Sequence, residues 1–109
     1  SGAPGKQGHV DGAAANAKMR AQGFQSTAYL LDADGAIGRA YGARTTPHMF
    51  VIAPDGTLAY AGGIDSIPSA NPADIAKAEP LARLALTQVA AGKPVATPTS
   101  KPYGCSVKY

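Results

Sequence analysis

Hydrophobic positions are densest in the middle of the 109-residue chain, where the segment from His48 to Ala53 is almost wholly apolar. A continuous apolar run of this length is typical of a strand that is buried on both faces. Pro-Asp-Gly at positions 54–56 follows it and favours a tight turn, and the segment from Thr57 to Gly62 supplies a second strand. The pattern therefore predicts an antiparallel hairpin.

Helical signals lie on both sides of this hairpin. The stretch from Ala13 to Gln22 predicts a helix that Gly23 ends in the left-handed conformation. A helix of one or two turns is expected near Ile37 to Tyr41. The main C-terminal helix is predicted from about Pro80 to Ala91, because proline is not tolerated deep inside a helix. Gly92 closes this helix, and its apolar face is expected to contain Leu81, Leu84, Ala85 and Val89.

Other segments carry weaker local signals. A short strand is predicted from Thr27 to Leu31, followed by the turn sequence of residues 32–35. Asn71 and Pro72 predict a helix N-cap and a first helical position. Residues 94–109 are rich in proline, threonine and serine and predict an extended tail of polyproline character, not a packed element. We therefore assign residues 1–93 to one domain and residues 94–109 to this tail.

Pro47 lies at the entrance of the first hairpin strand, where its lack of an amide proton does not interrupt a sheet. A cis Thr46–Pro47 peptide would expose the backbone of Thr46 to a ligand. The alternative is a trans proline that simply begins the strand. His48 comes next and is interpreted as a strand-entry histidine satisfied by backbone hydrogen bonds, in preference to a general base. Arg44 is interpreted as a solvated loop residue, although it could attract an anion.

The run from Tyr41 to Tyr60, with its Thr-Pro-strand-turn-strand order, resembles the thioredoxin-like redoxins. The segment from Leu30 to Gly35 and the ending from Lys101 to Tyr109 extend the resemblance, particularly to the peroxiredoxin-related alkyl hydroperoxide reductase and thiol-specific antioxidant family. In that family a Thr-Pro step of this kind faces a reactive cysteine. The resemblance implies an α/β, thioredoxin-like fold with a cis proline. Its elements here would be a helix, a strand, a short helix, an antiparallel hairpin, a C-terminal helix and an extended tail.

The cysteine content departs from this family pattern. Redoxins of this kind carry their nucleophilic cysteine near the N-terminus, on the helix after the first core strand, whereas the only cysteine here is Cys105. The chain is therefore interpreted as the C-terminal portion of a redoxin, lacking the N-terminal strands. In the thioredoxin-like fold those strands are central, so their absence would leave strand edges and an apolar face uncovered. We expect the missing N-terminal half of the domain, or a second subunit, as a partner.

Two functional classes follow. In the first, the chain belongs to a thiol-disulfide oxidoreductase or peroxiredoxin-like antioxidant protein that serves cell redox homeostasis. Thr46 and Pro47 would then border the substrate site, and Cys105 would be a resolving or exchange thiol, unless it is an incidental tail cysteine. A thiol/disulfide reductant protein or a peroxide would be the reaction partner, and this chain alone would be inactive. In the second, the chain is a noncatalytic redoxin-like module that binds an extended peptide.

Composition narrows the remaining possibilities. Residues 1–79 carry a net charge of −1, and four well-separated basic residues after position 79 bring the net charge to +3, so nucleic-acid binding is not expected. One cysteine and two histidines without a metal-ligand spacing predict no metal site, and no cofactor motif is present. No apolar stretch approaches the length of a membrane span, so no membrane partner is expected. The sequence gives no signal for a cell compartment.

Overall fold

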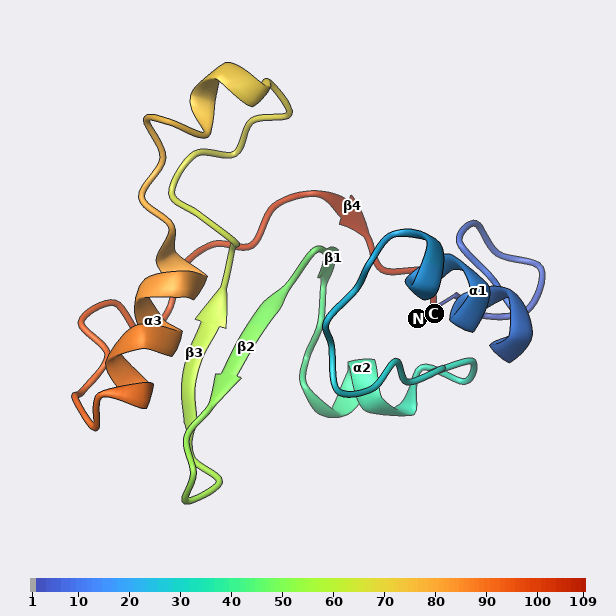
Figure 1. The fold of residues 1–109 in the computed structure, drawn as a ribbon, viewed down its shortest axis with the longest axis horizontal. Coiled ribbons are helices and arrows are strands. Elements are labelled where there is room, and N and C mark those ends of the chain that lie inside the picture. The colour runs from blue at the N-terminus through green and yellow to red at the C-terminus, as the bar shows by residue number, and fades with distance from the viewer. Residues whose placement is uncertain (1) are drawn as a thin grey trace. The chain divides into compact units, whose positions relative to one another are not determined.

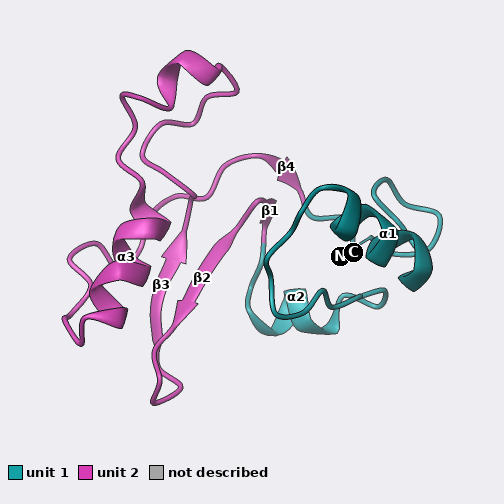
Figure 2. Ribbon diagram, in the orientation of Figure 1, with its two compact units in different colours: residues 1–43, 107–109 teal, residues 44–106 magenta. Residues whose placement is uncertain are grey.

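A computed structural model describes residues 2–109, which form two compact units (Figure 2). Unit 1 comprises the described residues up to Ala43 together with residues 107–109, and unit 2 comprises residues 44–106. The division differs from the predicted single domain with a tail. Residues 94–106 of the tail belong to unit 2, where Pro98 and Ser100 are hydrogen-bonded to Ala61 and residues 105 and 106 pair with residues 45 and 46.

The centre of unit 2 is an antiparallel hairpin, as the sequence predicts (Figure 1). Strand β2 spans Met49–Ile52 and strand β3 spans Leu58–Gly62, with Val51 opposite Tyr60. The turn between them is closed by a hydrogen bond from the Ala53 N–H to the Thr57 carbonyl oxygen, at 2.8 Å. Each strand is slightly shorter than predicted, and a register shift lies between Val51 and Ile52.

Helix α3 spans Leu81–Ala90 and packs against this hairpin. Pro80 occupies its N-cap position, so the predicted start is confirmed. The core contains the buried residues Tyr60, Leu81, Ala82 and Ala85. Leu84, predicted to be on the buried face, is instead 38% exposed. The hairpin contacts the side of the helix formed by Leu81, Ala82 and Ala85, so Ala82 takes the place that the periodicity assigned to Leu84.

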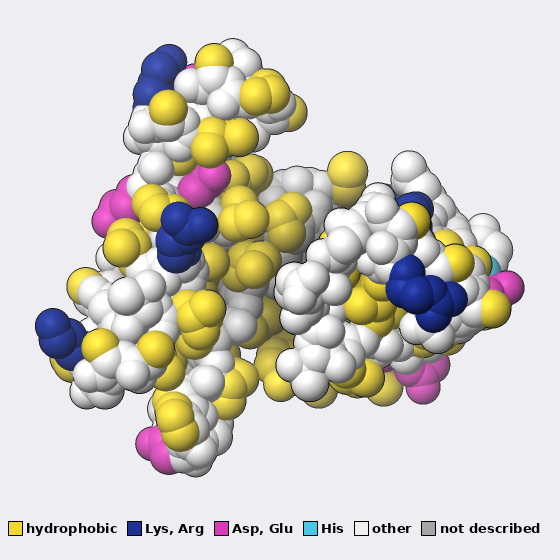
Figure 3. All heavy atoms as spheres, viewed as in Figure 1, with side chains coloured by type: hydrophobic (Ala, Val, Ile, Leu, Met, Phe, Trp, Pro, Cys, Tyr) yellow, Lys and Arg dark blue, Asp and Glu magenta, His cyan; other side chains and the backbone are white. Residues whose placement is uncertain are grey.

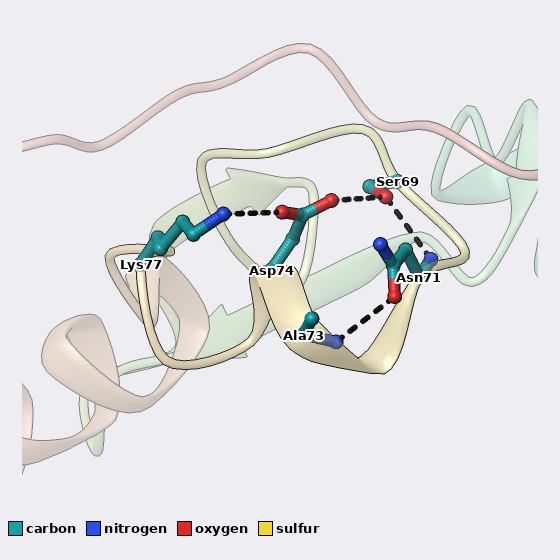
Figure 4. A network of polar contacts seen from close by, with 5 residues as sticks. All are labelled: Ser69, Asn71, Ala73, Asp74 and Lys77. Carbon is teal, nitrogen blue, oxygen red and sulfur yellow. Dashed lines mark hydrogen bonds and ion pairs between the residues drawn. The ribbon is translucent and has the colours of Figure 1, made fainter.

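The loop between β3 and α3 contains the 3-10 helix η1, Pro72–Asp74 (Figure 4). The predicted Asn71 cap is confirmed, since its side chain accepts a hydrogen bond from the Ala73 N–H at 3.1 Å. Asp74 accepts a hydrogen bond from the Ser69 hydroxyl at 2.7 Å and forms an ion pair with Lys77 at 3.2 Å. Side-chain contacts within the loop therefore fix this turn.

The end of the chain is extended, but the expectation that it is not packed is wrong. We call residues 98–106 the strap. The Ala61 N–H donates to the Pro98 carbonyl oxygen at 3.0 Å, and the Ser100 N–H donates to the Ala61 carbonyl oxygen at 3.2 Å. Further on, strand β4, Cys105–Ser106, pairs antiparallel with strand β1, Thr45–Thr46. The physical reason is that Ala61 has backbone groups that β2 does not use, and a half-buried backbone group needs a partner.

Unit 1 contains two helices. Helix α1 spans Gly12–Ala21, begins at an Asp11 cap and is followed by Gly23 with a φ of 63°, as predicted. Helix α2 spans Ala36–Ala40. Its first turn is held by Asp32, whose carboxylate accepts hydrogen bonds from the Gly38 N–H at 2.8 Å and from the Ile37 N–H at 3.0 Å. Hydrogen bonds from N–H groups favour the ionised carboxylate, so these bonds lower the pKa of Asp32. The bond from Gly38 contributes most.

The strand predicted from Thr27 to Leu31 is absent from the described residues, in which this segment has no regular structure. Leu30 is 71% exposed and Leu31 49% exposed. A strand exists only with a hydrogen-bonded neighbour, and the sheets of the described residues, β1–β4 and β2–β3, do not include this segment. The prediction therefore fails for lack of a pairing partner. The described residues form a mixture of helices and two small antiparallel sheets.

Candidate functional site

The loop that enters β2 contains the predicted cis proline. The Thr46–Pro47 peptide is cis, which confirms the expectation from the sequence. The Thr45 hydroxyl spans the loop by donating a hydrogen bond to the Pro47 carbonyl oxygen at 2.8 Å. Thr46 and Pro47 are both exposed. The side chains of the two residues predicted to border a substrate site are therefore accessible. The expectation that the backbone of Thr46 is open to a ligand is wrong, because β4 pairs with it.

Cys105 lies directly beside this loop. In the antiparallel pairing of β1 with β4, Thr46 is opposite Cys105 and Thr45 is opposite Ser106. Cys105 is a free, exposed thiol. The structure therefore brings together the three residues that the sequence analysis singled out, although Cys105 lies almost sixty positions further along the chain.

Gly104 makes this close approach possible. Its φ of 131° is a backbone conformation that side-chain-bearing residues rarely adopt. A Cβ atom at this position would overlap the Thr46 carbonyl oxygen and would lie 2.9 Å from the Thr46 carbonyl carbon and 3.3 Å from Pro47 Cδ. The sequence offered only a glycine next to a cysteine as a signal for this role.

Tyr103 holds the strap one residue before Gly104. Its hydroxyl donates a hydrogen bond to Asp65 Oδ1 at 2.5 Å. This bond to a carboxylate is the main cause that raises the pKa of Tyr103 to about 12. Asp65 Oδ1 also accepts a hydrogen bond from the N–H of Ile67, two residues further along the chain, at 3.1 Å. The sequence analysis missed both residues, because nothing in the sequence connects a tyrosine near the C-terminus with an aspartate in a loop 38 positions earlier.

Ser100 provides a second attachment of the strap. Its hydroxyl oxygen lies 2.7 Å from the Tyr60 hydroxyl and accepts the Gly63 N–H at 2.9 Å. The Tyr60 hydroxyl also donates to the Gly63 carbonyl oxygen at 2.6 Å, so Tyr60, which is 1% exposed, has its polar atom satisfied inside the unit. This network connects the strap to the end of β3.

His48 has the structural role that the sequence analysis preferred. The Arg44 N–H donates to His48 Nδ1 at 3.3 Å, and the imidazole ring packs against Phe50 with the ring centroids 4.4 Å apart. Burial, followed by the charge of Arg44, lowers the pKa of His48. A neutral ring is required for Nδ1 to accept this hydrogen bond. The Arg44 side chain is exposed, as expected.

A groove of about 790 Å³ lies in unit 2, between β2, the first turns of α3 and the loop before it. Figure 3 shows hydrophobic side chains gathered there. Several apolar residues of its lining are strongly exposed: Ile52, Ile64, Ile75 and Leu86. Among the described residues, β2 has a partner strand on one side only. An apolar strand with this surrounding is a site where another segment can add to the sheet.

Comparison with known proteins finds no matching family model, no matching curated protein and no matching solved structure. Within residues 2–109, no cluster of histidine, cysteine, aspartate or glutamate has the arrangement of a metal site. No helix in the same range is long and apolar enough to cross a bilayer.

Proposed function

We propose that this chain is the C-terminal portion of a thioredoxin-like thiol-disulfide oxidoreductase or peroxiredoxin-like antioxidant protein. Thr46 and Pro47 would border its substrate site, and Cys105 would be its resolving or exchange thiol. The observation that supports this proposal best is the register of β1 and β4, in which an exposed thiol lies opposite the residue that precedes Pro47. Strand pairing with Thr46 and the close approach of Gly104 hold this thiol at the loop.

The chemistry available to Cys105 is nucleophilic attack by its thiolate on an electrophilic sulfur. In disulfide exchange, a new bond forms between Cys105 Sγ and one sulfur of a disulfide, and the second sulfur leaves as a thiolate. In a peroxide cycle, the electrophile is a cysteine that a peroxide has oxidised to a sulfenic acid. The disulfide then forms as the sulfur–oxygen bond breaks and the oxygen leaves as water. A dithiol reductant protein returns both cysteines to thiols.

Either cycle needs a second cysteine, and Cys105 is the only one in this sequence. We infer that it is supplied by a partner, the missing N-terminal half of the redoxin domain or a second subunit. The groove beside β2 supports this inference, because its exposed apolar side chains match a face that further strands would cover. Unit 1 supports it as well, since Phe24 and Leu30 are 58% and 71% exposed and Ala15 is its only buried apolar residue among those described.

The proposal is tested by thiolation of the purified chain with glutathione disulfide, followed by addition of thioredoxin, thioredoxin reductase and NADPH. Cys105 is expected to form the mixed disulfide in the folded chain, because its thiol is exposed. After removal of the excess glutathione disulfide, the reductant should consume one equivalent of NADPH and stop, and added peroxide should give no turnover. A Cys105 that forms no mixed disulfide in the folded chain would exclude an exchange thiol. Repeated turnover that Cys105→Ser abolishes would show that the chain is not a partial enzyme.

The groove also supports a second candidate, a noncatalytic module that binds an extended apolar peptide along β2. The two proposals differ in their dependence on the thiol. If the chain is a binding module, titration calorimetry should give the same affinity for an apolar, strand-forming peptide with the wild type and with Cys105→Ser. Such binding, together with an unreactive Cys105, would favour the module over the oxidoreductase.

A further inference from the structure

We propose that Tyr103 and Ser100 are positioning residues that hold Cys105 at the loop of Thr46 and Pro47. The inference rests on the proposed function and adds to it a device that sets where the reacting thiol lies. Both residues act through the strap, residues 98–106, and neither needs to contact the substrate.

The first attachment is made at the end of β3. The Ser100 hydroxyl accepts the Gly63 N–H at 2.9 Å and lies 2.7 Å from the buried Tyr60 hydroxyl. A Cβ atom at Gly62 would overlap Ser100 Oγ and would lie 2.8 Å from the Ser100 nitrogen. Ser100 can therefore pack against the end of β3 only because Gly62 has no side chain.

The second attachment is the Tyr103 hydroxyl on Asp65, at 2.5 Å. The carboxylate is itself oriented by the Ile67 N–H, at 3.1 Å. The ring of Tyr103 lies close to Gly63: a Cβ atom at position 63 would be 3.4 Å from Tyr103 Cδ1. Hydrogen bonds to ionised acceptors are stronger than those between neutral groups. Among the described side-chain contacts of the strap, this hydrogen bond is the one nearest to Cys105 on its N-terminal side.

Only Gly104 separates this attachment from Cys105. Pairing of β4 with β1 involves two residues on each strand, and a ladder this short has little stability of its own. Fixing Tyr103 therefore raises the effective concentration of Cys105 at position 46, as a short tether does for a second binding event. Without the attachment, the same thiol samples a larger volume, and encounters at the loop become less frequent.

Thr46→Cys provides a direct reporter of this effective concentration. Opposed residues of antiparallel strands have Cα separations of about 4.5 to 5.5 Å, which lie within the range that a disulfide bridges. In a glutathione redox buffer the two protein thiols are oxidised to a disulfide while glutathione disulfide is reduced to two glutathione thiols. The equilibrium constant of this exchange measures the effective concentration. Thr45→Cys is the matched control, because position 45 is opposite Ser106 and is expected to give a much smaller constant.

The test adds second substitutions to the Thr46→Cys chain. Tyr103→Phe and Asp65→Ala are each expected to lower the equilibrium constant roughly ten- to a hundredfold, the range for loss of a hydrogen bond to a charged group. Asp65→Asn retains an oxygen acceptor but not the charge and should give an intermediate value. Ser100→Ala should lower the constant as well. Hydrogen exchange of the residue 105 and 106 amides provides a second measurement, and it should be faster in Tyr103→Phe.

Leu84→Ala controls for a general loss of stability, because Leu84 lies on α3 outside the buried cluster that contains Tyr60. A constant unchanged in the control and lowered in Tyr103→Phe supports the positioning role. The proposal is overturned if Tyr103→Phe has the wild-type constant, if the control lowers it equally, or if Thr46→Cys forms no disulfide. These outcomes do not depend on a second natural cysteine, so they are distinct from failure of the thiolation test.

Discussion

Gly104→Ala should detach Cys105 from the loop of Thr46 and Pro47 while leaving the rest of unit 2 folded. A new Cβ atom would lie 2.9 Å from the Thr46 carbonyl carbon, whereas such atoms prefer separations of about 3.5 to 4.0 Å. The strands would therefore have to separate by roughly 1 Å, which breaks the hydrogen bonds of a two-residue ladder. The φ of 131° adds strain of about 1 to 3 kcal/mol for a residue with a side chain.

The assay is the glutathione equilibrium of the Thr46→Cys chain with and without Gly104→Ala. A free-energy cost of about 1 to 3 kcal/mol corresponds to a decrease of roughly five- to 150-fold in the equilibrium constant. Gly92→Ala is the matched control, since Gly92 also has a positive φ, 68°, but a Cβ atom there meets nothing within 4 Å. It should lower the free energy of unfolding without changing the disulfide equilibrium. Equal constants for Gly104→Ala and its parent would refute the argument from close approach.

Three further predictions concern pH and the groove. The Tyr103 pKa is raised from 10.0 to about 12, so the stabilisation from its bond to Asp65 is complete below pH 10 and lost as the pH rises toward 12. The difference in the free energy of unfolding between wild type and Tyr103→Phe should therefore shrink above pH 10 in urea titrations, and a constant difference would contradict the assignment. The Asp32 pKa is lowered from 3.8, mainly by the Gly38 N–H. Protection of the Gly38 amide from hydrogen exchange should therefore persist at about pH 4 and decrease at lower pH, as Asp32 becomes protonated. Finally, Leu86→Lys in the groove should reduce self-association of the isolated chain in sedimentation velocity, and Ala90→Lys, which carries the same charge outside the groove, should not.

Local signals in the sequence predicted the elements whose structure is decided locally. The hairpin followed from an apolar run and a turn sequence, and the Asn71 cap and the Pro80 start of α3 followed from the preferences of those residue types. The cis Thr46–Pro47 peptide followed from the family resemblance. The hairpin, the cap and the helix start each depend on a few adjacent residues, so a sequence window contains the information that determines them, whereas the residues alone left the isomer of Thr46–Pro47 open.

Features that depend on distant partners were not predicted. Residues 27–31 have the composition of a strand, but no described strand lies beside them to complete a ladder. The strap has the composition of a polyproline segment, and its attachments are determined by Tyr60, Asp65 and the backbone of Ala61, all far away in the sequence. A two-residue strand such as β4 has no hydrophobic period, so the pairing of Cys105 with Thr46 could be found only in three dimensions.

The arrangement of unit 2 determines where a complementing segment can add to the hairpin. The strap occupies the backbone groups of Ala61 on β3, so a further strand cannot pair there without displacing it. It must add at β2, along the groove. Because β2 begins two residues after Pro47, a strand that adds antiparallel to β2 ends near the loop that Cys105 reaches from β4. We therefore expect a nucleophilic cysteine carried at the end of such a strand to meet Cys105 at this loop, as the proposed function requires.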